Sequence, residues 1–127
     1  MSGVSRTFIV MAIVYACIGV AMGIWMGINQ DFTRMHLHAH NNLIGWASLA
    51  IFGVIYHVVP DLAQSKLAKL HLLLAGLGTA IFLVGLPLAD AGITISLAVV
   101  GSLMVLAGTV LFLLLFVSQT RARALSA

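Results

Sequence analysis

Four long apolar stretches, separated by short polar breaks, constrain this chain more than any other feature. They cover residues 7–28, 35–59, 67–88 and 92–117. A helix that crosses the hydrocarbon core of a bilayer needs about 20 mostly apolar residues, and each stretch reaches that length. Membrane-spanning strands alternate apolar and polar residues, and these stretches do not. The sequence therefore predicts an all-α integral membrane protein with four spanning helices.

Composition agrees with a chain that is largely surrounded by lipid. Of the 127 residues, 62% are hydrophobic and 7% are charged, whereas soluble domains carry about 25% charged residues. This length predicts one domain, residues 1–127, and short connections make consecutive helices antiparallel neighbours in a bundle. The net charge of +3 comes from only six basic residues, which excludes a nucleic-acid-binding patch. Cys17 is the single cysteine, so no intrachain disulfide can form.

The basic residues predict how the bundle is oriented. In a four-helix meander only Arg34 falls on one side, and the other side carries Arg6, Lys66, Lys69, Arg121 and Arg123. The positive-inside rule then places both termini and the central loop in the cytoplasm, and we expect a multi-pass protein of the bacterial inner membrane. We expect the first stretch to remain as a span, because it is longer than a signal-peptide core and no small-residue cleavage site follows it.

Glycines are spaced for close helix packing. Gly19, Gly23 and Gly27 form two overlapping G-x-x-x-G repeats in the first helix. Such repeats create a groove where another helix backbone can approach closely, either within the chain or from a second chain. Gly101 and Gly108 lie one heptad apart in the fourth helix.

Three histidines open the second helix at His36, His38 and His40. Histidine inside a bilayer is costly and therefore a functional candidate. At about 100° per residue His36 and His40 share a face and can chelate one metal, while His38 points nearly opposite. All three can bind copper or zinc together only where this segment is not helical. The alternative is that these histidines are simply hydrated at the level of the lipid headgroups. Helix rise places His40 deeper than the other two, about 8–12 Å into the membrane.

Two further histidines, His57 and His71, stand near the cytoplasmic ends of their helices. Helix rise places His57 about 25 Å from His40, too far to share a metal within one chain. With Lys66 and Lys69, His71 can contact anionic lipid headgroups.

The remaining polar and aromatic residues offer few catalytic candidates. Tyr56 and Trp46 are candidates for the interfacial aromatic belt or for packing against a cofactor. We expect Asp31, Asp61 and Asp90 to be solvated in loops. The sequence has no Ser/His/Asp set, phosphate-binding loop, cysteine pair or paired carboxylates, so hydrolysis and phosphoryl transfer have no candidate residues.

The second helix also carries a longer pattern, formed by His40, Asn41, Asn42, Leu43, Trp46, Gly53, Tyr56 and Pro60. This pattern resembles the second helix of haem–copper oxidase catalytic subunits, most of all nitric oxide reductases, and short four-helix proteins described as oxidase subunit I-like. The resemblance implies that His40 is an axial ligand of haem b near the periplasmic side, where the predicted topology also places it. It further implies that Arg34 pairs with a haem propionate and that Asn42 and Trp46 line the cofactor.

The large oxidase subunits contain three similar four-helix arcs, and this chain resembles one arc. A haem with two histidine ligands needs imidazoles from two facing helices. We therefore expect a homo-oligomer, a trimer by analogy with the three arcs or a dimer as the simplest case, with His36 or His38 as a second ligand or a neighbouring group. The predicted role is electron transfer or a redox role linked to a diatomic gas, with a redox partner; an enzyme of this kind would be an oxidoreductase of haem–copper oxidase type.

Two other functions remain open at this point. The first is a copper- or zinc-binding membrane protein that uses His36, His38 and His40, because imidazole suits those ions as well as iron. The second is a non-catalytic interaction subunit that packs against a larger membrane complex through the glycine groove.

Overall fold

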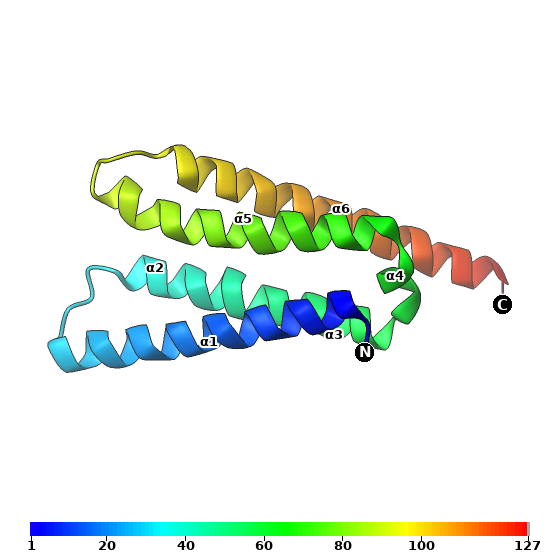
Figure 1. Cartoon of the computed structure of the whole chain (residues 1–127), viewed down its shortest axis with the longest axis horizontal. Coiled ribbons are helices and arrows are strands. Elements are labelled where there is room, and N and C mark those ends of the chain that lie inside the picture. The colour runs from blue at the N-terminus through cyan, green and yellow to red at the C-terminus, as the bar shows by residue number, and fades with distance from the viewer. Residues whose placement is uncertain (127) are drawn as a thin grey trace.

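The computed structural model describes residues 1–126, and every regular element in that range is helical. The elements are α1 (Gly3–Asn29), α2 (Met35–His40), the π-helical segment η1 (Asn41–Ser48), α3 (Leu49–Val58), α4 (Pro60–Gln64), α5 (Lys66–Asp90) and α6 (Ser96–Ser126). Figure 1 shows that α2, η1 and α3 follow one another as a single rod.

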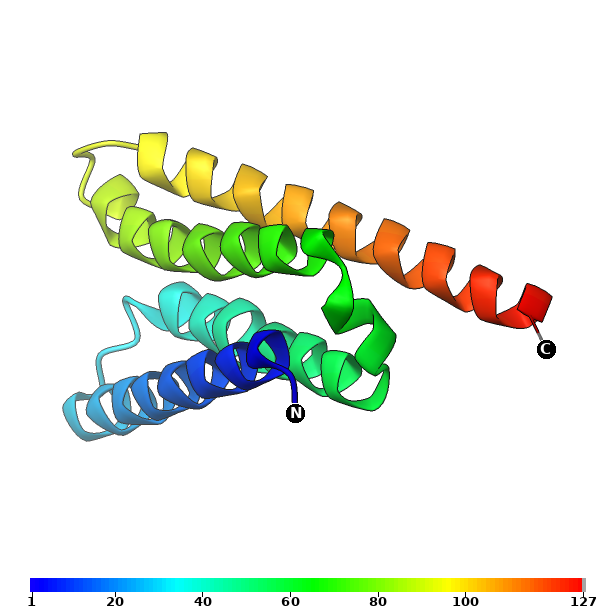
Figure 2. The same cartoon turned by 45° about the vertical axis from the view of Figure 1, so that its right-hand side comes forward.

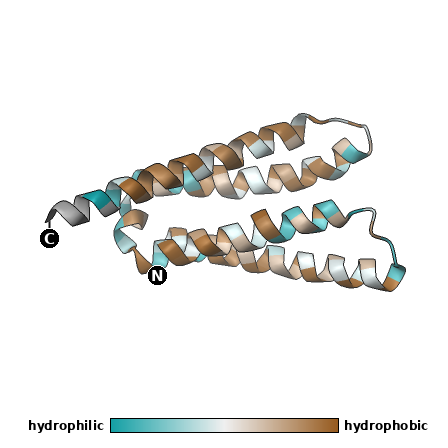
Figure 3. Cartoon of the chain, turned by 180° about the vertical axis from the view of Figure 1, so that it is seen from behind, coloured by the Kyte–Doolittle hydropathy of each residue, from teal (hydrophilic) through white to brown (hydrophobic). Residues whose placement is uncertain are grey.

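Four helical segments are long and apolar enough to cross a membrane: Gly3–Asn29, Met35–Val58, Lys66–Asp90 and Ser96–Gln119. The predicted all-α fold with four spans is therefore confirmed. Figure 3 shows the expected distribution along the ribbon, with hydrophobic residues along the helices and hydrophilic ones near the loops and at the start of α2.

Several helix ends differ from the predicted ones: the first helix begins at Gly3 rather than at Thr7, and the fourth extends to Ser126 rather than to Val117. The fourth helix begins at Ser96 rather than at Gly92, because Gly92 adopts a left-handed φ of +70° and the Thr94 hydroxyl accepts a hydrogen bond from Ser96 N at 3.2 Å. The second helix ends at Val58, because Val59 leaves the helical conformation and Pro60 opens the separate short helix α4. Proline is well suited to the first turn of a helix.

The helices form two antiparallel hairpins joined by α4. In Figures 1 and 2, α1 runs against α2–η1–α3, and α5 runs against α6. Both termini lie at the α4 end, and the loops after α1 and α5 lie at the other end. We call that other end the loop end.

All four spans meet in one aromatic cluster near the α4 end, formed by Phe8 (α1), Phe52 and Tyr56 (α3), His71 (α5) and Phe112 (α6). The His71 ring lies 4.7 Å from Phe52, 5.0 Å from Phe112 and 5.1 Å from Phe8, centre to centre. Tyr56 and His71 are both fully buried, and the Tyr56 hydroxyl is 3.0 Å from His71 Nδ1.

This cluster corrects two expectations. His71 cannot contact lipid headgroups, because none of it is exposed. Tyr56 belongs to the core rather than to an interfacial belt. His71 Nε2 is also buried and has no hydrogen-bond partner among the described residues.

The glycine groove of α1 is filled by the chain's own second span. A Cβ at Gly19 would collide with the side chains of Asn41 and Asn42, and one at Gly23 would lie 3.3 Å from the His38 ring. Among the described residues, none lies within 4 Å of a Cβ placed at Gly27. Gly19 and Gly23 therefore let α1 pack closely against the α2–η1 segment. The helix that fills the groove belongs to the same chain.

The π-helical segment η1 directly follows His40. Its first residue, Asn41, is buried and donates from Nδ2 to the Tyr15 carbonyl of α1 at 2.8 Å. Gly45 lies against the Tyr15 ring, where a Cβ would come within 2.7 Å of the ring carbon Cγ. Helical segments of the π type are rare and often occur at functional sites. The position of η1 directly after His36, His38 and His40 therefore supports these histidines as functional candidates.

Candidate functional site

The three histidines of α2 face three different neighbours. His36 Nε2 lies 2.8 Å from Asp90 Oδ2 on α5. The His38 ring lies against Gly23 on α1, with Asn42 Nδ2 3.3 Å from its Nε2. The structure therefore does not bring the three side chains together. In residues 1–126, no group of three His, Cys, Asp or Glu side chains is placed to hold a metal ion.

His40 packs on the second hairpin. Its ring meets the Phe82 ring of α5 edge-on, with centres 5.3 Å apart and planes at 70°. Its Nδ1 lies 2.8 Å from the His36 carbonyl oxygen, one turn earlier in the same helix. A carbonyl can only accept a hydrogen bond, so Nδ1 carries the proton and donates it.

This hydrogen bond determines what the other nitrogen of His40 can do. With the proton on Nδ1, the neutral ring has an acceptor lone pair on Nε2. Histidines that bind metals are commonly oriented in this way, through a bond from the non-ligating nitrogen to a carbonyl or carboxylate. No hydrogen-bond partner of Nε2 occurs among the described residues. The half-buried His40 is therefore the best prepared of the three as a metal ligand.

His36 and Asp90 link the two hairpins at the loop end. Their side chains are 41% and 50% exposed, so Asp90 is not simply solvated, as the sequence suggested. The pair is ionic only when His36 is protonated. Exposed pairs of this kind contribute about 0–1 kcal/mol, and this contact therefore positions His36 more than it stabilises the fold.

Replacing Asp90→Asn is expected to lower the free energy of unfolding by less than about 1 kcal/mol. In the His36→Gln background the same change should have almost no effect, because the partner is already gone. Unfolding of the detergent-solubilised protein, followed by circular dichroism, measures both. A loss above about 2 kcal/mol in the single variant would contradict the view that this is a weak surface pair.

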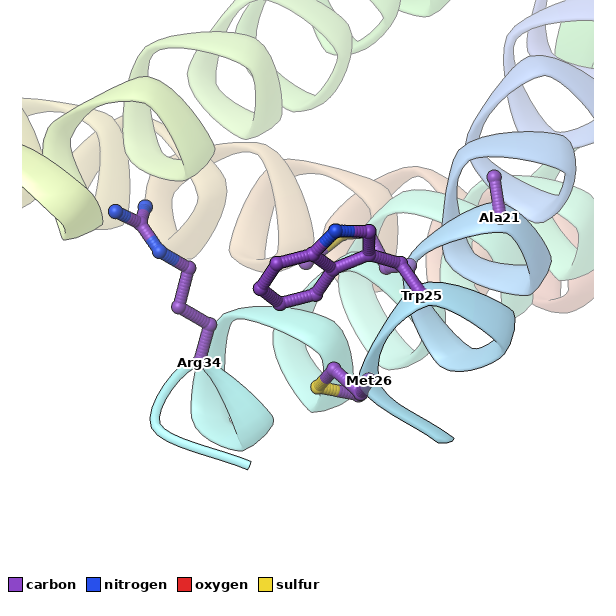
Figure 4. A pocket seen from close by; sticks show the side chains of 5 residues that line it. Ala21, Trp25, Met26 and Arg34 are labelled. Carbon is purple, nitrogen blue, oxygen red and sulfur yellow. The ribbon is translucent and has the colours of Figure 1, made fainter. Parts of the chain in front are cut away.

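Arg34, the residue before α2, borders two cavities at the loop end. One has a volume of about 390 Å³ and is lined by Ala21, Met22, Trp25, Met26 and Arg34. Figure 4 shows the Trp25 ring extending from α1 into the space between that helix and Arg34. The other, of about 360 Å³, is lined by Thr33, Arg34, His36, Pro87, Asp90 and Ala91. Arg34 thus lies between an apolar cavity and the polar His36–Asp90 contact.

Asn42 and Trp46, the other two residues of the predicted site, make no side-chain contact with His40 among those found in the described residues. Asn42 donates to the His38 carbonyl at 2.8 Å and packs at Gly19, so its side chain is part of the α1 contact. Trp46 is 49% exposed on η1. Sequence reasoning missed Phe82, because nothing in an apolar helix distinguishes the phenylalanine that will lie beside a histidine of another span.

Comparison of the chain with protein-family models, with curated proteins and with solved structures finds no match in any of the three.

Proposed function

We propose that this chain is a multi-pass haem b protein of the bacterial inner membrane, with both termini in the cytoplasm and His40 as an axial ligand. The observation that carries the proposal is the hydrogen bond from His40 Nδ1 to the His36 carbonyl, at 2.8 Å. It leaves Nε2 as the ligand nitrogen and orients the ring before any metal binds. When bound, the haem would supply a one-electron couple between its ferric and ferrous states.

The second axial ligand is proposed to come from another copy of the chain. His36 Nε2 is buried 2.8 Å from Asp90 Oδ2, and the half-buried His38 ring packs between Gly23 and Asn42. Each chain thus offers one prepared imidazole, whereas a haem with two histidine ligands needs two. A symmetric oligomer in which two His40 side chains face each other meets this requirement. Electron transfer is the role that such a haem with both axial positions filled supports best.

The alternative role as an interaction subunit loses its main support. It relied on the glycine groove of α1, and the side chains of Asn41, Asn42 and His38 fill that groove at Gly19 and Gly23. A partner protein would have to displace the second span to reach these glycines.

The test is an absorption spectrum of the detergent-purified protein, oxidised and then reduced with dithionite, after expression with ample haem. We expect a Soret band and sharp α and β bands on reduction, and loss of these bands in His40→Ala. His57→Ala is the matched control, since His57 is exposed near the opposite end of the same span, and it should keep the wild-type spectrum. Imidazole added to His40→Gly should restore the bands, because the free ligand can occupy the vacated position.

Two results would overturn the proposal. One is a featureless wild-type spectrum, and the other is a haem spectrum that His40→Ala leaves unchanged. Bound copper or zinc without a Soret band would instead favour the metal-binding alternative. The ratio of haem to protein tests the shared site, which predicts one haem for each pair of His40 side chains that face each other.

A further inference from the structure

The 390 Å³ cavity beside Arg34 has the character of a site for an amphiphile. Apart from Arg34, its lining residues are the apolar Ala21, Met22, Trp25 and Met26. Figure 4 shows Arg34 at one side of this space and the Trp25 ring at the other. A ligand that fits must therefore combine an apolar body with a group that suits a guanidinium.

A second cavity lies between the hairpins and shares one lining residue, Met22, with the first. It has a volume of about 260 Å³, and its other lining residues include Leu37 on α2 and Leu83 and Val84 on α5. An elongated apolar chain that starts near Arg34 and follows α1 past Met22 would lead toward this second cavity.

The guanidinium of Arg34 has no ion-pair partner among the described residues. The nearest acidic residue in sequence, Asp31, accepts a hydrogen bond from the Thr33 backbone N–H at 3.0 Å. Hydrogen bonds from Thr33, with a smaller effect of the Arg34 charge, hold the pKa of Asp31 below its ordinary value. The other carboxylate at the loop end, Asp90, lies at His36. Arg34 is also the only lysine or arginine in residues 7–65, so an anion at the loop end has one strong cation to bind.

We propose that this cavity binds an anionic phospholipid, with the phosphate on Arg34 and an acyl chain along Met22 and Trp25. A guanidinium presents paired donors that match phosphate oxygens, and tryptophan favours the headgroup level of a membrane. A zwitterionic lipid brings its own ammonium group to the phosphate, so the unpaired Arg34 favours a lipid with net negative charge.

The test is native mass spectrometry of the full chain in mixed micelles that contain equal amounts of phosphatidylglycerol and phosphatidylcholine with the same acyl chains. We expect the wild-type protein to retain phosphatidylglycerol about fivefold over phosphatidylcholine, in line with about 1 kcal/mol for one basic residue at a membrane surface. Arg34→Gln should bring that ratio close to one. Arg6→Gln removes an exposed charge at the opposite end of the bundle and should leave the ratio unchanged.

A second variant tests the apolar part of the site. Trp25→Ala should reduce the amount of both lipids retained while keeping the preference for phosphatidylglycerol, because the acyl contact is shared and the charge contact is not. An unchanged preference in Arg34→Gln would overturn the proposal. Loss of haem in Arg34→Gln, with lipid retention unaffected, would also overturn it and would assign Arg34 to a propionate. The lipid measurement does not need haem, so it remains valid if the proposed haem function fails.

Discussion

Gly101→Leu is expected to separate α5 from α6 and to cost more than about 3 kcal/mol of unfolding free energy. A Cβ at position 101 would fall on the backbone of Phe82 and lie 2.8 Å from the Gly78 carbonyl oxygen. Backbone atoms inside a regular helix cannot move aside as the end of a side chain can. The two helices must therefore part, and the contacts on either side of Gly101 are lost with them.

Thermal unfolding in detergent, followed by circular dichroism, measures this effect. Gly27→Leu is the matched control, because no described atom lies within 4 Å of a Cβ at that position. It should shift stability by no more than about 0.5 kcal/mol. A wild-type unfolding midpoint for Gly101→Leu would show that the backbones of α5 and α6 are not in close contact at Gly101.

The second large effect is expected at the Tyr56–His71 hydrogen bond. His71→Ala removes a fully buried ring from contact with Phe8, Phe52 and Phe112 and leaves the Tyr56 hydroxyl without its partner. A cavity and a stranded polar group together should cost about 3–5 kcal/mol. Tyr56→Phe keeps the ring and strands His71 Nδ1, so it should cost about 1–3 kcal/mol.

The double variant distinguishes packing from hydrogen bonding. In Tyr56→Phe combined with His71→Ala no polar group is stranded, so the total loss should be smaller than the sum of the two single losses by about 1 kcal/mol or more. The same detergent unfolding assay applies. Strictly additive losses would indicate that the two side chains do not interact, and the 3.0 Å contact would then be without energetic effect.

The spans could be predicted because they depend on length and hydrophobicity alone. The four stretches coincide with four helices, and the larger differences lie at helix ends, at Gly3 of the first and at Ser96 and Ser126 of the fourth. The close-packing role of Gly19 and Gly23 could also be predicted, since G-x-x-x-G spacing has a direct geometric meaning. Their partner could not, because spacing on one helix does not specify which surface covers it.

Residues whose role depends on a distant neighbour were not predictable. His71 lies two residues beyond Lys69 in sequence and therefore suggested a headgroup contact, but α5 rotates it into the core beside Tyr56. The shared face of His36 and His40 follows from helix periodicity. The partners of these two histidines depend on how the second hairpin packs against the first, which brings Asp90 to His36 and Phe82 to His40.

The π-helical segment has a consequence for the angular phase of the second span. Each π turn holds more residues than an α turn, so the eight residues of η1 rotate the chain less than eight α-helical residues would. The orientation of His40 relative to Tyr56, on either side of η1, is thus fixed by one local irregularity rather than by sequence spacing. A π turn holds one residue more than an α turn, so a one-residue deletion within η1 that restored α-helical winding would leave the part of the rod before η1 and the part after it close to their present angular phase. With Tyr56 anchored in the core, the imidazole of His40 would still face Phe82 after that deletion, whereas winding all eight residues of η1 as an α-helix would turn it away, although no residue that contacts it had been changed.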